Sequence, residues 1–196
     1  VLIKAVSEDA GRIEPALHAL YSADRVEILR VETVGPAVGS ELSKKAIWTL
    51  ALALGAILIY IAFRFKLVYA LAAIVALFHD VFVAAFVFSM TGREFSLPII
   101  GALLTIIGYS VNDTIVIFDR IRENVRNMRR TPYIEVVNIS INETLSRTAL
   151  TSLTVFIVVM ALFLFGGPVI NDFAFIMLIG TISGVYSTVF IASPFV

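Results

Sequence analysis

The sequence predicts a polytopic α-helical membrane protein, preceded by part of an α+β domain of the ferredoxin-like type. Hydrophobic residues make up 59% of its 196 residues and charged residues only 15%, whereas soluble domains average about 45–50% apolar and about 25% charged residues. The apolar residues also gather in five long runs, and a helix needs roughly 20 such residues to cross a bilayer. Composition and clustering therefore predict five membrane spans.

Residues 1–37 are predicted to form the C-terminal part of a small extracytoplasmic α+β domain. Residues 2–6 form a short extended run, and residues 25–34 alternate in polarity like a second strand. Between them lie apolar residues that share one helical face: Ile13, Leu17 and Leu20. A unit this small does not bury its own core. We therefore interpret the chain as a fragment whose missing strands precede it.

Residues 38–196 are predicted to form the transmembrane domain. Its expected spans are residues 44–63, 67–92, 96–118, 148–167 and 173–194. Segment 119–146 separates the third and fourth spans. Pro132 is suited to begin a helix there, and Ile134, Val137 and Ile141 keep one apolar face. This pattern predicts an amphipathic helix on the cytoplasmic membrane surface.

Basic residues set the expected orientation. Most of them lie in the turn 64–66 and in the loop 119–147, which we call the arginine-rich end. Its basic residues are Arg64, Lys66, Arg120, Arg122, Arg126, Arg129, Arg130 and Arg147. The opposite loops, 91–97 and 167–172, contain only Arg93. The positive-inside rule then places the arginine-rich end and the C-terminus in the cytoplasm, and residues 1–37 outside.

Asp113 is the residue for which any function must account. It lies inside the apolar run 96–118, about 9–10 Å from its charged end at 1.5 Å per residue. An ionised carboxylate in hydrocarbon costs at least ~2.5–3.5 kcal/mol, and such residues usually carry a proton or an ion. The alternative is a carboxylate solvated from the helix end. Four apolar residues, 115–118, separate Asp113 from that end and disfavour this alternative.

Two spans carry stripes of small and polar residues, which allow close helix contacts. The stripe next to Asp113 consists of Gly101, Thr105, Gly108 and Asn112. The stripe in the last span consists of Gly180, Ser183, Gly184 and Ser187. We expect the first to border an interface with another helix and the second to pack tightly within the bundle.

Arg147 is the expected partner of Asp113. It opens the fourth span at the end where the span of Asp113 finishes. An arginine favours the charged form of a nearby carboxylate and burial favours the neutral form, so the two together can hold a proton site near working pH. Snorkelling of Arg147 to the interface fits the spacing equally well. The candidate supporting polar residues are Asn112, Thr114, Ser146, Thr148 and Ser152. The hydroxyls of the fourth span form a face suited to hold water.

His79 and Asp80 form a second polar pair near the middle of the second span. Adjacent helical residues point about 100° apart, so both do not face one partner. A second proton relay and a structural hydrogen bond between helices both fit this pair.

Several classes of function are disfavoured. The chain has no cysteine and two separated histidines, which disfavours a metal site. It contains no nucleophile–base arrangement and no phosphate loop, so we expect neither an enzyme nor a cofactor, with protons as the coupling ion. The basic segment 119–130 is interrupted by Asp119 and Glu123 and adjoins the membrane, which disfavours nucleic-acid binding.

Residues 108–124 (GYSVNDTIVIFDRIREN) resemble the SecF branch of the SecD/SecF family, which belongs to the RND superfamily. Residues 34–39, 77–80 and 145–148 resemble the same family, in the expected order. The resemblance implies an RND-like half bundle that lacks its first span and part of a periplasmic domain. It also implies a bacterial inner-membrane protein that works with SecD, fused or separate, on preproteins leaving through SecYEG, in contact with membrane lipids.

The family resemblance further implies a motor driven by the proton-motive force, with Asp113 and Arg147 in proton transport. Two alternatives remain from the residues alone. One is an RND-type exporter of lipids or small molecules, although the short loops 91–97 and 167–172 provide no large external domain. The other is a non-transporting membrane scaffold.

Overall fold

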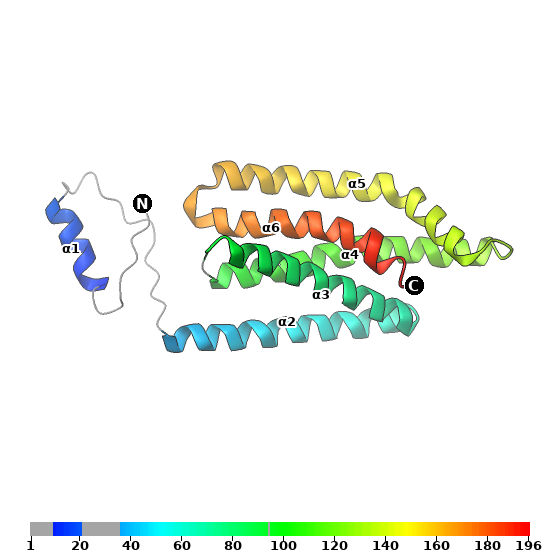
Figure 1. Cartoon of the computed structure of the whole chain (residues 1–196), viewed down its shortest axis with the longest axis horizontal. Helices are drawn as coiled ribbons and strands as arrows, with labels where there is room; N and C mark the ends of the chain where they lie inside the picture. The colour runs from blue at the N-terminus through cyan, green and yellow to red at the C-terminus, as the bar shows by residue number, and fades with distance from the viewer. Residues whose placement is uncertain (1–9, 21–35, 94) are drawn as a thin grey trace. The chain divides into compact units, whose positions relative to one another are not determined.

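The structure, a computed structural model, describes residues 10–20, 36–93 and 95–196 (Figure 1). The chain divides into two compact units, Val1–Ile47 and Trp48–Val196. The described part of the first unit contains helix α1 (Ala10–Leu20), which confirms the helix expected between the two extended runs. Those runs, residues 2–6 and 25–34, lie outside the described residues, so the α+β domain stays a prediction.

In the described part of the chain, five long helices follow that are long and apolar enough to cross a membrane, which confirms the five expected spans. They are α2 (Pro36–Arg64), α3 (Leu67–Met90), α4 (Leu97–Asn127), α5 (Tyr133–Phe165) and α6 (Gly167–Ser187). The short π-helical turn η2 (Thr188–Ala192) continues α6.

The segment 119–146 differs from its prediction. A helix does begin directly after Pro132, but it runs without a break into the following span as α5. No glycine or proline lies between Tyr133 and Phe165, so nothing interrupts the helical hydrogen bonds. The expected apolar face is confirmed only in part. Val137 is buried and Ile141 packs against the same core cluster, but Ile134 is 84% exposed and Val136 is buried in its place.

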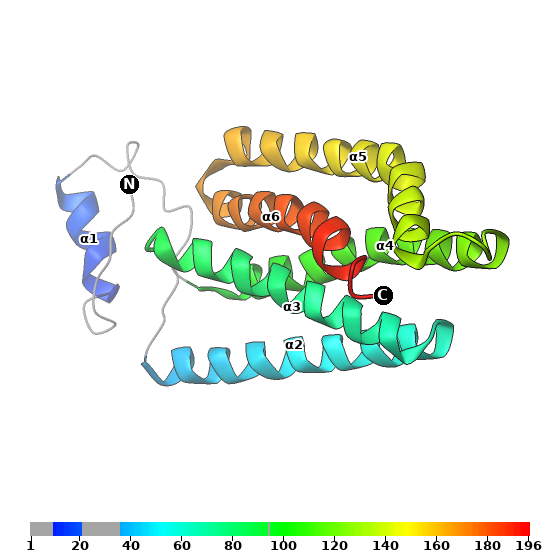
Figure 2. The ribbon, with the colours of Figure 1, turned by 45° about the vertical axis from the view of Figure 1, so that its right-hand side comes forward.

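Helix α5 is bent rather than straight. Figure 2 shows a yellow-green limb that turns into the longer yellow-to-orange limb. In the first half of the helix, the Ser140 hydroxyl donates to the Val136 carbonyl and the Thr144 hydroxyl to the Ser140 carbonyl. Hydroxyl groups that bond to the carbonyl four residues earlier often bend helices.

Helix α6 packs against α3, α4 and α5. Its approach to α4 is close at Gly180, where an added Cβ would lie 2.2 Å from the Cδ1 atom of Ile106. Only glycine fits this position without moving the buried Ile106 side chain. The prediction that this small-residue face packs tightly within the bundle is confirmed.

The core of the bundle has two apolar clusters with a polar layer between them. One cluster lies towards the arginine-rich end and includes Ile117, Phe118 and Ile121 of α4. The other lies towards the opposite end and includes Ile99, Leu103 and Ile106 of the same helix. Buried polar residues occupy the helix segments between the clusters: Asp80, Ser110, Asp113, Thr114, Thr181, Ser183 and Ser187.

The end opposite the arginine-rich end is tied together by Arg93. Its guanidinium forms an ion pair with Asp172, donates to Asn171 Oδ1 at 2.9 Å and lies 4.6 Å from the centre of the Phe175 ring. These contacts join the α3–α4 connection to the start of α6.

Candidate functional site

Asp113 lies on α4 within the polar layer and is only 4% exposed. Its Oδ1 atom accepts a hydrogen bond from Thr151 Oγ1 and its Oδ2 atom one from Ser152 Oγ, both at 3.4 Å. The Ser152 hydroxyl in turn accepts from the Tyr109 hydroxyl at 2.7 Å. Hydrogen bonds between oxygens usually measure 2.5–3.0 Å, so both donors from α5 hold this carboxylate loosely.

Arg147 lies on α5 and is exposed. Helices α4 and α5 are neighbours, which was the condition for Arg147 and Asp113 to approach each other. No ion pair joins the two residues, although both are described. The structure therefore places Arg147 at the edge of the site rather than in contact with the carboxylate.

The supporting residues divide into two groups. Ser152 bonds to Asp113, and Thr148 is buried one helical turn from Ser152. Asn112 and Ser146 are exposed, and Thr114 turns towards η2, where its hydroxyl lies 3.1 Å from that of Thr188. Of these predicted supporting residues, Ser152 is the one that bonds to Asp113 in the structure.

The small-residue stripe of α4 is exposed along its whole length, from Gly101 to Asn112. A Cβ added at Gly101 or Gly108 would have no neighbour within 4 Å. No described helix of this chain packs there. The interface that this stripe predicts therefore stays a prediction, for a helix other than those described.

Asp80 is the second buried carboxylate, and it is 0% exposed. Its Oδ2 atom accepts hydrogen bonds at 2.6 Å from Ser110 of α4 and Ser187 of α6. Its Oδ1 atom accepts one at 2.7 Å from Ser183 and lies 3.3 Å from His79 Nδ1. Asp80 thus bonds inside the bundle, as expected for one member of the pair, while His79 is 31% exposed.

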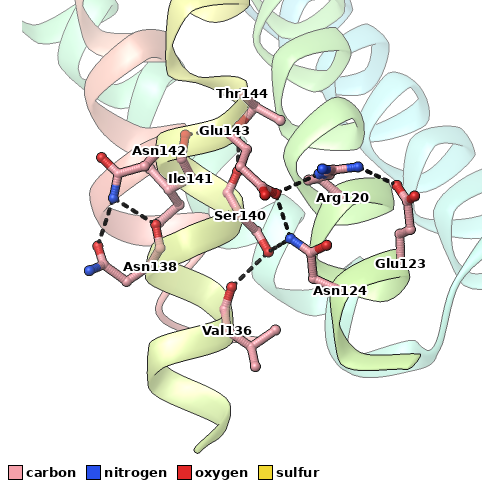
Figure 3. A network of polar contacts seen from close by, with 10 residues as sticks. All are labelled: Arg120, Glu123, Asn124, Val136, Asn138, Ser140, Ile141, Asn142, Glu143 and Thr144. Carbon is pink, nitrogen blue, oxygen red and sulfur yellow. Dashed lines mark hydrogen bonds and ion pairs between the residues drawn. The ribbon is translucent and has the colours of Figure 1, made fainter. Parts of the chain in front are cut away.

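A network of charged and polar residues connects α4 and α5 at the arginine-rich end (Figure 3). Arg120 donates to Glu143 at 2.6 Å and to Glu123 at 2.7 Å. The Asn124 amide donates to Glu143 at 2.6 Å and to Ser140 at 3.0 Å. This network was not predicted from the sequence. The spacing of Arg120 and Glu123 on one helical face was the available signal.

The comparisons with known proteins identify relatives of this chain. The family described as "Protein export membrane protein SecD/SecF, C-terminal" matches residues 14–196. The protein translocase subunit SecF of Desulfurispirillum indicum is 50% identical over 192 residues, which cover 96% of this chain and 61% of that protein. The protein translocase subunit SecDF of Thermus thermophilus is 47% identical over 96% of this chain and 25% of its own length.

Solved structures agree with the sequence matches. The crystal structure of the translocon-associated membrane protein SecDF from Thermus thermophilus matches with a TM-score of 0.86 and 45% identity, over 99% of this chain and 27% of the other. The structure of SecDF in its super-membrane-facing form matches with a TM-score of 0.80 and 46% identity. The chain thus spans about three fifths of the SecF relative and about a quarter of the SecDF relatives.

Proposed function

The chain belongs to the SecD/SecF family of protein-export membrane proteins, and from this premise we propose that it forms the SecF part of a proton-driven membrane motor. The motor assists the export of preproteins through SecYEG. Asp113 carries the proton, and Arg147 modulates the protonation of its carboxylate. Family membership favours this function over an RND-type exporter of lipids or small molecules.

The observation that supports the proposal is the loose hold on a buried carboxylate. Asp113 is buried at 4% exposure, yet its two donors lie at 3.4 Å. A buried charge without close partners is costly, so gain or loss of a proton at Asp113 has a large effect on the free energy of its surroundings. Such a residue is suited to couple protonation to helix packing.

Protonation of Asp113 removes a buried charge and changes which packing of α4 and α5 has the lowest free energy. Each charge that crosses a potential of 100 mV releases ~2.3 kcal/mol, which suffices for a conformational shift. Arg147 supplies a mobile counter-charge. Its long side chain starts four residues before Thr151 on the same helix, so a movement of α5 changes its distance to Asp113.

The proposed location is the bacterial inner membrane, with the arginine-rich end and the C-terminus in the cytoplasm. The proposed partner in the membrane is SecD. One relative is named as a SecDF protein of which this chain covers 25%, which supports a close association of the two halves. SecYEG, the preprotein and membrane lipids complete the proposed set of partners.

The test uses the full-length protein with SecD in inverted membrane vesicles. Asp113→Asn keeps the shape of the side chain but does not exchange a proton. The matched control is Asp119→Asn, which neutralises an exposed carboxylate on the same helix. Completion of preprotein export is followed with and without an imposed proton-motive force. We expect Asp113→Asn to abolish the force-dependent part and Asp119→Asn to preserve it.

An Asp113→Asn complex that assembles and keeps the full force dependence of export contradicts the proposal. Asp113 is then structural, and the non-transporting scaffold becomes the better interpretation.

A further inference from the structure

Helix α5 carries a ladder of buried hydroxyl groups at every fourth position. The residues of this hydroxyl ladder are Ser140, Thr144, Thr148 and Ser152, with exposures of 0%, 7%, 1% and 8%. Residues four apart lie above one another on a helix. The ladder therefore runs along one buried face for about 18 Å, at 1.5 Å per residue.

The two ends of the hydroxyl ladder meet different surroundings. At the inner end, the Ser152 hydroxyl donates to Asp113 Oδ2. At the outer end, Ser140 accepts a hydrogen bond from Asn124, which also donates to Glu143. Figure 3 shows this end beside Arg120 and Glu123, and the Glu143 side chain is 35% exposed. The buried face of the ladder thus extends from beside the buried carboxylate to beside a water-accessible polar surface.

Thr148 occupies the middle of the ladder and differs from its neighbours. The hydroxyls of Ser140 and Thr144 donate to carbonyls of their own helix. The buried Thr148 Oγ1 has no hydrogen-bond partner among the described residues. Most buried polar side-chain atoms have a partner, either in the protein or in an ordered water molecule. Thr148 thus marks the position where a water molecule would continue the ladder.

We propose that the hydroxyl ladder, completed by water molecules between its hydroxyls and first of all at Thr148, is the path by which the proton moves between Asp113 and the arginine-rich end. This inference rests on the proposed function and adds the route that the proton takes. The O–H bond of the protonated Asp113 carboxyl breaks, each hydroxyl or water on the path accepts one proton and passes on another, and a water at the outer end becomes hydronium. Asp113 is left as an anion, so charge and atoms balance.

The hydroxyl contacts alone do not explain why Thr148 is a threonine. Thr154 shows the ordinary case on the same helix, because its side chain is exposed and its hydroxyl donates to the Thr151 carbonyl. The Thr148 hydroxyl makes no such bond. Valine has the shape of threonine without its hydroxyl. In a purely structural role, valine would therefore suit the buried position 148 at least as well.

The experiment reconstitutes the full-length complex with SecD into liposomes and measures proton flux driven by an imposed potential. Thr148→Val removes the central hydroxyl, Thr148→Ser keeps it, and Thr154→Val is the matched control. We expect Thr148→Val to lower the flux at least fivefold without lowering the melting temperature. Thr148→Ser and Thr154→Val should stay within twofold of the wild type. Thr144→Val is a second variant with the same expected loss.

A wild-type flux in both Thr148→Val and Thr144→Val overturns the path, as does an equal loss in Thr154→Val. Asp113→Asn distinguishes this failure from failure of the proposed function. If Asp113→Asn abolishes the flux while both ladder variants keep it, only the path is wrong. If Asp113→Asn also keeps the flux, the proposed proton site is wrong.

Discussion

Replacing Asp80 should destabilise the bundle more than replacing any exposed carboxylate. Asp80 is fully buried and accepts three hydrogen bonds of 2.6–2.7 Å from Ser110, Ser183 and Ser187. These donors belong to α4 and α6, so one side chain of α3 ties three helices together. Asp80→Ala removes the common acceptor, whereas Asp80→Asn keeps one oxygen and the shape of the side chain.

The size of the effect follows from the hydroxyl groups that lose their partner. A buried donor left unsatisfied costs about 1–3 kcal/mol. Ser187 also donates to the Gly184 carbonyl at 3.2 Å, so two of the three hydroxyls lose the only acceptor that the structure shows. Asp80→Ala should therefore lower the free energy of unfolding by about 2–6 kcal/mol. Asp80→Asn should cost about 1 kcal/mol, since its amide oxygen still accepts and its amide nitrogen donates to a hydroxyl.

The assay is denaturant unfolding of the full-length protein in detergent, followed by circular dichroism of its helices. Asp119→Ala is the control, because Asp119 forms a 3.2 Å ion pair with Arg64 in which both side chains are about half exposed. Exposed pairs contribute about 0–1 kcal/mol. An Asp80→Ala protein as stable as the Asp119→Ala control would refute the reasoning. Equal losses in Asp80→Asn and Asp80→Ala would show that the charge matters and not the hydrogen bonds.

Two further substitutions probe the packing of the bundle. Gly180→Ala should cost about 1–3 kcal/mol through overpacking, because its Cβ would lie 2.2 Å from Ile106 Cδ1. Ile106→Ala leaves a cavity of its own, but it relieves the clash, so the Gly180→Ala/Ile106→Ala protein should lose less stability than the two single variants together. Strictly additive melting-temperature changes would contradict the clash. Arg93→Lys should lower the stability almost as much as Arg93→Ala does. Lysine keeps the charge but lacks the flat guanidinium group that lies over the Phe175 ring. Full recovery of the melting temperature in Arg93→Lys would show that charge alone suffices.

The spans could be predicted from the sequence because their length and apolar composition are direct requirements of the bilayer. The tight face of α6 was predictable for a similar reason, since Gly180 and Ser183 recur at helical spacing with no large side chain between them on that face. The burial of Asp113 beside α5 also agrees with the expectation from its apolar neighbours. These features depend on local periodicity, which the sequence records.

Features that depend on helix rotation were not predictable in the same way. The stripe that ends at Asn112 was expected to mark a packed face, but in the described chain α4 turns that face outward. The partners of Asp80 come from positions 30, 103 and 107 residues away, and no local pattern connects them. The exposure of Arg147 likewise depends on how α5 is rotated against α4. Only the three-dimensional packing fixes these orientations.

Asp80 and Asp113, the two buried carboxylates of the described residues, lie in one polar layer and differ in how tightly they are held. Under the proposed function, this difference locates the movement. Asp80 is held by short hydrogen bonds from two helices, so its arrangement has one clear minimum in free energy. Ser110, one of its donors, lies one turn before Asp113 on α4. The anchor at Asp80 therefore fixes α4 against α3 and α6. Both hydrogen bonds to Asp113 come from hydroxyl groups of α5, and both are long at 3.4 Å. A change of protonation at Asp113 should therefore shift α5 more easily than α3, α4 or α6. Helix α5 also carries Arg147 and the hydroxyl ladder.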